Sequence, residues 1–249
     1  MVDYLFDDAT RLADSTVIDI QRRLSTNGWL ILQSTPEADL EASLLSLRAI
    51  FGGVVRHPFS REEGVVVVDN AYRPPRGMSP HTDGTYYPEP PAVVCLQCVT
   101  PAKSGGASTL VDGARLYAHL ARSHGPDLPL LFEPVLGVRR NDRFVRSSVF
   151  WRAQNRVCVR FRSDETIELE VTPAVRAAID EIRRFVEDPA NQIEFKLERG
   201  QILVTDNTRF LHGRTPYDGS EPRHMNRMHL DGLSKAGPLQ LGFVPGASA

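Results

Sequence analysis

The feature that most constrains this chain is a His-x-Asp pair, His81 and Asp83, answered far downstream by His212. Side chains alternate between the two faces of a β-strand, so His81 and Asp83 would point the same way on an extended segment. Two imidazoles and one carboxylate form a ligand set that leaves three positions of a non-haem Fe(II) ion open. An isolated His-x-Asp pair is more often structural. The hypothesis therefore depends on the sequence around both segments.

The chain length favours a single domain spanning residues 1–249, because β-rich folds of this size bury one full core. Hydrophobic residues at 41% and charged residues at 24% are ordinary for a globular protein. A net charge of -2 gives no argument for nucleic acid or an anionic membrane as a partner. No apolar run approaches the ~20 residues of a membrane span, and the N-terminus lacks the basic start of a secretory signal. We expect a cytoplasmic protein that binds a small molecule, and a homo-oligomer stays open.

The cysteines predict no metal or redox site. Cys95 and Cys98 lie within the apolar segment 93–99, which has the composition of a strand. Three positions apart on a strand, their side chains point to opposite faces and cannot chelate one ion. We expect both thiols to be buried as small apolar groups.

Helical spacing of apolar residues occurs before and after the β-rich middle of the chain. Asn27-Gly28 is a typical stop for the first helix, and Thr35-Pro36 and Thr172-Pro173 are typical starts for the next two. Helices in this arrangement usually buttress a sheet. The three apolar stripes are Val17-Ile20-Leu24, Leu40-Leu44-Leu47 and Val175-Ile179-Ile182-Val186.

Two blocks of short motifs surround the two candidate ligand segments. The first block holds His81-Thr82-Asp83, then Pro-Pro-Ala at 90–92, Gly-Gly at 105–106 and Asp-Gly at 112–113. The second block holds 200–204, Asp-Asn at 206–207, 212–217 and Arg223. Over roughly residues 28 to 231, this order resembles the taurine dioxygenase-like (TauD/TfdA) family of Fe(II)- and 2-oxoglutarate-dependent oxygenases.

The resemblance implies a mainly β fold with flanking helices, the double-stranded β-helix or jelly-roll barrel of cupin-like enzymes. It implies Fe(II) bound by His81, Asp83 and His212, which would be the catalytic residues, with 2-oxoglutarate as co-substrate and O₂ as oxidant. The implied reaction couples oxidative decarboxylation of 2-oxoglutarate to C–H oxidation of a small metabolite. Hydroxylation is the default outcome, and desaturation or cyclisation would need only another substrate pose.

The same resemblance assigns the co-substrate contacts. Arg223 would bind the distal carboxylate of 2-oxoglutarate, because the guanidinium fork matches a carboxylate in one plane. A hydroxyl after the Gly-Gly pair would also touch the co-substrate, and both Ser108 and Thr109 fit that position. Adjacent strand residues face opposite ways, so only one of them can serve.

The substrate contacts rest on charge. Arg227 lies four residues after Arg223 on what we expect to be the last core strand, so both should share a face. We expect Arg227 to bind an anionic group of the substrate, with Asn70 or Tyr86 shaping the wall. The alternative for Arg227 is an ion pair with Asp231, four residues on.

A second candidate for anion binding is the segment 139–162, which holds eight arginines and a single acid. On an expected strand over 157–162, Arg160 and Arg162 would share one face and could border the pocket. The alternative is a solvated strand pair with no part in binding.

Two rival functions use the same barrel. A cupin-type hydrolase or isomerase would hold Zn or Mn at the His-Asp-His set, but it would have no use for Arg223 or the Gly-Gly hydroxyl segment. A non-catalytic binding module would be expected to have lost a ligand or that arginine, and all four residues are present.

Overall fold

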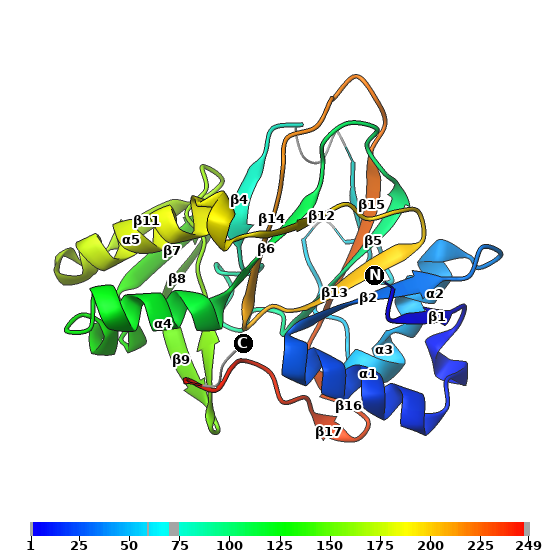
Figure 1. The fold of residues 1–249 in the computed structure, drawn as a ribbon, viewed down its shortest axis with the longest axis horizontal. Coiled ribbons are helices and arrows are strands. Elements are labelled where there is room, and N and C mark those ends of the chain that lie inside the picture. Colours follow the sequence, from blue (N-terminus) through cyan, green and yellow to red (C-terminus); the bar gives the residue numbers. More distant parts are fainter. Residues whose placement is uncertain (1, 59, 70–74, 247–249) are drawn as a thin grey trace.

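Two sheets facing each other form the centre of the molecule in the computed structural model, which describes residues 2–58, 60–69 and 75–246 (Figure 1). The larger sheet has the strand order β1 (Tyr4–Phe6), β2 (Trp29–Ser34), β13 (Gln201–Asp206), β5 (Val93–Thr100), β15 (His224–Leu230), β3 (Val66–Val68). The smaller sheet has the order β12 (Ile193–Phe195), β6 (Ser108–Asp112), β14 (Phe210–Arg214), β4 (Met78–His81). This is the expected mainly β, jelly-roll arrangement. Within the described ranges the two sheets stay separate, and no closed barrel forms.

Three helices cover the outer face of the larger sheet: α1 (Asp14–Asn27), α2 (Leu40–Ser46) and α3 (Arg48–Phe51) (Figure 1). Strand alternation divides the core, since Val204 packs against these helices while its neighbour Leu203 packs between the sheets. Gly28 ends α1 with a φ of 79°, as the Asn27-Gly28 pair predicted. The predicted start at Thr35-Pro36 is wrong. Those residues open a turn, and Asp39 caps α2 by accepting from the amide of Ala42 at 3.0 Å.

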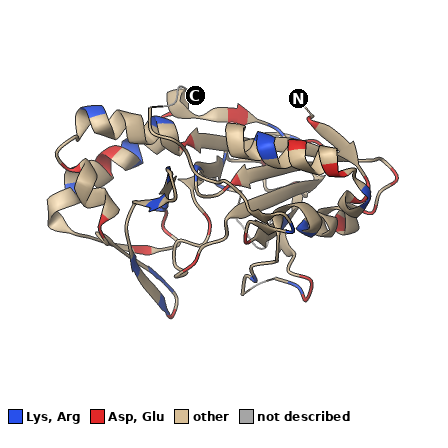
Figure 2. Cartoon of the chain, turned by 90° about the horizontal axis from the view of Figure 1, so that it is seen from below, with Lys and Arg blue, Asp and Glu red and all other residues tan. Residues whose placement is uncertain are grey.

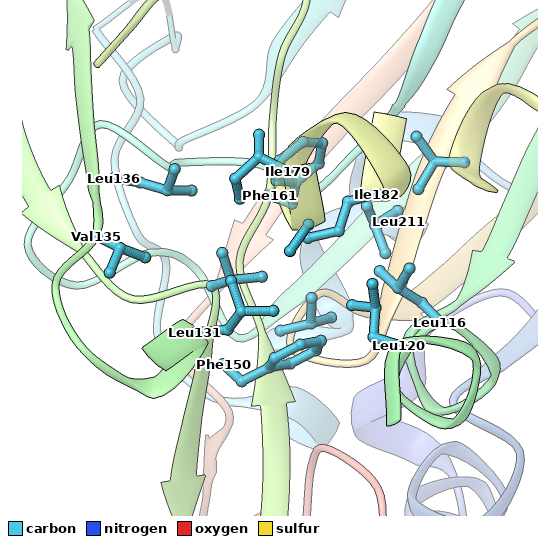
Figure 3. Packing of buried hydrophobic residues seen from close by; sticks show 14 of the residues in the cluster. Leu116, Leu120, Leu131, Val135, Leu136, Phe150, Phe161, Ile179, Ile182 and Leu211 are labelled. Atoms are coloured by element: carbon cyan, nitrogen blue, oxygen red, sulfur yellow. The ribbon is translucent and has the colours of Figure 1, made fainter. Parts of the chain in front are cut away.

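The outer face of the smaller sheet packs against α4 (Gly113–Ser123) and α5 (Arg176–Glu187), the latter preceded by a 3₁₀ turn at Pro173–Val175. Figure 3 shows Leu116 and Leu120 of α4 in the same buried cluster as Ile179 and Ile182 of α5. Burying each such side chain contributes about 1.5–3 kcal/mol. Beside this cluster lie a three-stranded sheet, β11 (Glu168–Val171), β7 (Leu136–Arg140), β8 (Arg143–Ser147), and a hairpin of β9 (Phe150–Ala153) with β10 (Arg156–Val159). A last small hairpin joins β16 (Leu233–Ser234) to β17 (Gly237–Pro238).

The space between the two sheets forms a third apolar cluster that includes Cys98, Leu110, Leu203 and Met225. Cys95 belongs instead to the helix-covered side, so the two thiols do face opposite ways, and both are free and buried. Figure 2 shows basic and acidic residues interspersed along the helices. Of the helices in the described segments, none is long and apolar enough to cross a membrane.

Candidate metal centre

Three side chains from the two predicted segments converge between the sheets. His81 ends β4, and its register partner across the strand pair is His212 of β14. The expectation that Asp83 shares a strand with His81 is wrong, since β4 ends at His81 and Asp83 lies in the following turn. The turn nevertheless brings the Asp83 carboxylate to 3.5 Å from Nε2 of His81 and 3.7 Å from Nε2 of His212. One ligand atom from each residue lies within 4.8 Å of the others, so the group could hold a metal ion.

Asn207, just after β13, fixes the backbone of that turn. Its Oδ1 accepts from the amide of Asp83 at 2.8 Å, and its Nδ2 donates to the carbonyl of Asp83 at 3.0 Å and to that of Pro91 at 2.7 Å. All of these groups are buried, and a hydrogen bond is electrostatically stronger inside a protein than in water. The sequence presented Asn207 only as part of a motif. The structure shows that it positions Asp83.

The two imidazoles have the protonation and the vacant lone pairs that a metal site needs. Nδ1 of His81 lies 2.9 Å from the carbonyl of Ser79 and must carry the proton there, which leaves Nε2 as an acceptor. That Nε2 is buried and has no hydrogen-bond partner among the described residues, although it faces the Asp83 carboxylate. Burial lowers the pKa of His81 and lowers that of His212 to about 3, so both rings are neutral. Neutral imidazoles and a carboxylate suit a divalent transition metal, and the residues therefore fit Fe(II).

Two side chains of β15 hold the other side of Asp83. Nη1 of Arg227 donates to Oδ2 at 3.1 Å, and Nε2 of His229 donates to the same oxygen at 2.9 Å. Burial raises the pKa of Asp83, but the charge of Arg227 and the bond from His229 outweigh it and hold that pKa well below the usual value. Asp83 is therefore a carboxylate.

This arrangement excludes the alternative given for Arg227 and adds a residue. Arg227 does not pair with Asp231, whose carboxylate accepts from the backbone amides of Gly53 at 2.9 Å and Leu233 at 2.8 Å. His229 was not identified from the sequence. The available signal was its position two residues after Arg227, which puts both on one face of the strand.

A pocket opens beside His212 between the sheets, with Arg223, Arg227 and Ser108 among its lining residues. Arg223 precedes β15 instead of lying on it, yet it shares the pocket with Arg227 as the spacing predicted. Its side chain is buried and stacks over the ring of Tyr217 at 5.4 Å. Most of the remaining wall is apolar, formed by Val68, Met78, Val94, Leu96 and Leu203, and Thr205, Gly213 and Arg214 complete it.

The structure separates the two candidate hydroxyls on β6. Ser108 lines the pocket. The Thr109 side chain projects from the opposite face of the strand. There its Oγ1 lies so close to Gly213 that a Cβ on that glycine would clash with it. Of the two, Ser108 is the one placed to touch a ligand in this pocket.

Tyr86, predicted to form part of the substrate wall, is 5% exposed and belongs to a polar cluster next to Asp83. Its hydroxyl accepts from Nη1 of Arg140 at 2.9 Å and lies 3.3 Å from Nε2 of His57, and the guanidinium of Arg140 stacks over its ring at 4.9 Å. Asn70, the other candidate for that wall, lies outside the described residues.

The two arginines expected on one strand face diverge, because β10 ends at Val159. Arg160 donates to the carbonyl of Pro88 at 3.1 Å and lines a separate open cleft with Trp151. Arg162 is 1% exposed and forms an ion pair with Asp164 at 2.7 Å. Arg160 is therefore not among the residues that line the pocket beside His212.

Comparison with known proteins gives one family match over nearly the whole chain. The model described as "Taurine catabolism dioxygenase TauD, TfdA family" matches residues 3–229. Among curated proteins, the chain is 26% identical over 195 residues to the trimethyllysine dioxygenase of Meyerozyma guilliermondii, covering 68% of this chain and 46% of that protein. It is 29% identical over 144 residues to the uridine-5'-phosphate dioxygenase of an Amycolatopsis species, covering 53% and 52%. The chain thus spans about half the length of the curated relatives it matches.

Solved structures show the same fold. A putative alpha-ketoglutarate-dependent taurine dioxygenase from Burkholderia xenovorans superposes with a TM-score of 0.71 at 19% identity, covering 95% of this chain and 94% of that one. An asparagine oxygenase in complex with Fe(II), 2S,3S-3-hydroxyasparagine and succinate superposes with a TM-score of 0.69 at 18% identity, covering 92% and 84%.

Proposed function

The chain belongs to the TauD/TfdA family of taurine catabolism dioxygenases, and from this premise we propose that it is an Fe(II)- and 2-oxoglutarate-dependent oxygenase acting on a small metabolite. The observation that carries the proposal is the buried Nε2 of His81, an acceptor facing the carboxylate of Asp83 with His212 alongside. Two acceptors buried face to face need a cation between them, because neither can donate to the other.

Five residues in or beside the pocket have roles in this proposal. His81, Asp83 and His212 hold Fe(II), which together with 2-oxoglutarate and O₂ supplies oxidative decarboxylation coupled to C–H oxidation. Arg223 binds the distal carboxylate of 2-oxoglutarate in a bidentate pair, and Ser108 donates to the same group. Buried apolar walls between the sheets keep water from this end of the pocket, which strengthens both contacts.

We further propose that the substrate is a small anionic metabolite, such as an amino acid or a natural-product intermediate, and that it is hydroxylated. Trimethyllysine and uridine-5'-phosphate, named for two relatives, carry a carboxylate and a phosphate. Two cations could bind such a group. Arg227 lines the pocket and also pairs with Asp83, and Arg140 lies beside Tyr86. Arg139, next to Arg140, is already paired with acids of β11.

An anaerobic titration tests the iron and co-substrate part of the proposal. Fe(II) and 2-oxoglutarate added together should give a weak visible metal-to-ligand charge-transfer band, and either one alone should not. A metal hydrolase or a non-catalytic module would give no such band. For the substrate, a panel of amino acids, their amides and nucleotides is scored by succinate release. Preference for an amide or another compound without an anionic group would refute the anionic class while leaving the oxygenase assignment intact.

A further inference from the structure

The two oxygens of Asp83 lie in different surroundings. Oδ2 receives hydrogen bonds from Nη1 of Arg227 at 3.1 Å and Nε2 of His229 at 2.9 Å. An oxygen of a carboxylate has two lone-pair sites, so both sites of Oδ2 are taken. Oδ1 lies 3.5 Å from Nε2 of His81 and Oδ2 lies 3.7 Å from Nε2 of His212, so both oxygens face the candidate metal position, and the difference between them is the pair of donors on Oδ2.

The two donors lie on a strand of the larger sheet that is paired on both sides at Arg227. Arg227 and His229 lie two apart on β15, which pairs with β5 on one side and with β3 on the other. Both side chains are at most 7% exposed. The ring of His57 also meets that of His229 edge-on, with centroids 5.8 Å apart. Buried donors held by strand pairing can fix an acceptor to within about half an ångström.

From this geometry we infer that His229 and Arg227 are positioning residues that hold Asp83 as a one-oxygen ligand, an inference that rests on the proposed function. With Oδ2 held by its two donors, Asp83 and the two histidines would occupy three positions on a bound metal ion and would leave three open. If both oxygens of Asp83 could bind, only two positions would stay open, too few for a chelating co-substrate and O₂ together. The pair therefore sets the number of open positions without touching the metal.

Metal binding by the full-length protein tests this without any substrate. Co(II) affinity is measured by competition with a chelating dye for wild type, His229→Met and His229→Gln. Methionine removes the donor, whereas glutamine keeps an amide N–H at a similar reach. We expect Co(II) affinity to fall about 10–100-fold in His229→Met, the usual cost of losing such an outer hydrogen bond, and to recover to within a few-fold of wild type in His229→Gln. His224→Met is the matched control, because His224 is on the same strand and bonds Asn226 instead of Asp83, and its affinity should equal that of wild type.

Several outcomes would overturn the inference. Unchanged Co(II) affinity in His229→Met would overturn it directly. An equal loss of affinity in His229→Gln and His229→Met would also overturn it, because the loss would then come from altered packing and not from the missing donor. Should His229→Met fail to fold, judged by its near-UV circular dichroism, Arg227→Met, which likewise removes a donor to Oδ2, replaces it and must show a loss of the same order for the inference to stand. Failure of the proposed function is distinguishable, since wild type would then show no charge-transfer band with Fe(II) and 2-oxoglutarate, whatever the variants do.

Discussion

His81 and His212 are direct register partners across β4 and β14, with ring centroids 4.8 Å apart. The pairing between these strands shifts register between His212 and Arg214, so the ladder is regular at the histidines and irregular just beyond them. Such an irregularity re-aims the side chains that follow it. Two imidazoles therefore face one space by virtue of the strand pairing alone, and Asp83 must be brought to them by its turn.

Removing His212 should abolish activity without unfolding the protein. His212 lines the pocket and bonds no other side chain through Nδ1 in the described structure, so its loss removes a ligand without removing a core contact. In His212→Ala we expect Fe(II)-dependent succinate formation to vanish while the melting temperature of the metal-free protein stays within a few degrees. Near wild-type turnover in this variant would show that the triad assignment is wrong.

Removing Asp83 should abolish activity and also destabilise the protein. Asp83 is the buried carboxylate partner of Arg227, and taking one member from a buried ion pair costs about 3–5 kcal/mol. Asp83→Ala should therefore lose stability on that scale in urea unfolding of the metal-free protein, unlike His212→Ala. The double variant Asp83→Ala, Arg227→Met should regain much of it. Equal stabilities for Asp83→Ala and wild type would contradict the ion pair.

Motif spacing was enough to predict the triad, the pocket arginine and the fold class. His81, Asp83 and His212 come together as their motifs predicted, the two histidines through strand order and Asp83 through its turn. Arg223 lines the pocket beside His212, although it lies just outside β15. To choose between Ser108 and Thr109, one must know which face of β6 lines the pocket, and that depends on how the two sheets are placed.

The contacts of Asp83 and the arginines could not be predicted, because they depend on turns and strand ends. Asp83 lies in a turn after His81 and not on the expected strand, and the turn brings its carboxylate to Arg227. Closeness in sequence had suggested Asp231 as the alternative partner of Arg227. In the same way, β10 stops at Val159, one residue before the alternation that was to pair Arg160 with Arg162. Strand ends and turns are set by local hydrogen bonds that apolar periodicity does not encode.

Replacing Arg223 by lysine should weaken co-substrate binding. Lysine keeps the charge and loses the two-pronged fork, so the apparent affinity for 2-oxoglutarate should fall by about 1–3 kcal/mol. The charge-transfer titration measures this directly as a function of 2-oxoglutarate concentration. Fe(II) affinity without 2-oxoglutarate should not change. An unchanged 2-oxoglutarate affinity would show that another cation holds the carboxylate.

Removing each of the two hydroxyls of β6 should affect 2-oxoglutarate affinity differently. Ser108→Ala removes a donor that lines the pocket, so 2-oxoglutarate affinity should fall by about 0.5–1.5 kcal/mol, the worth of one hydrogen bond. Thr109→Val keeps the shape of a side chain on the other face and should leave that affinity unchanged. The reverse order of effects would assign the contact to Thr109.

Acid should destabilise the metal-free protein below about pH 6.5. Burial, helped by the charge of Arg227, lowers the pKa of His57 to about 3, and burial lowers that of His212 to about 3 as well. The unfolded chain takes up a proton on each ring near pH 6.5, while the folded chain refuses it until near pH 3. The free energy of unfolding should therefore decrease as the pH falls from 6.5 toward 3, by up to ~1.4 kcal/mol per pH unit for each histidine.

His57→Gln isolates one of these contributions, since His57 bonds Tyr86 and is not a candidate ligand. An amide in its place can still bond the Tyr86 hydroxyl but takes up no proton in either state. In urea unfolding at a series of pH values, the pH slope for His57→Gln between 6.5 and 4 should be shallower than that of wild type by up to ~1.4 kcal/mol per unit. Above pH 7 the two curves should run parallel, because neither state of wild type is protonated at His57 there. Identical slopes below pH 6.5 would mean that the folded protein accepts a proton on His57 as readily as the unfolded chain does.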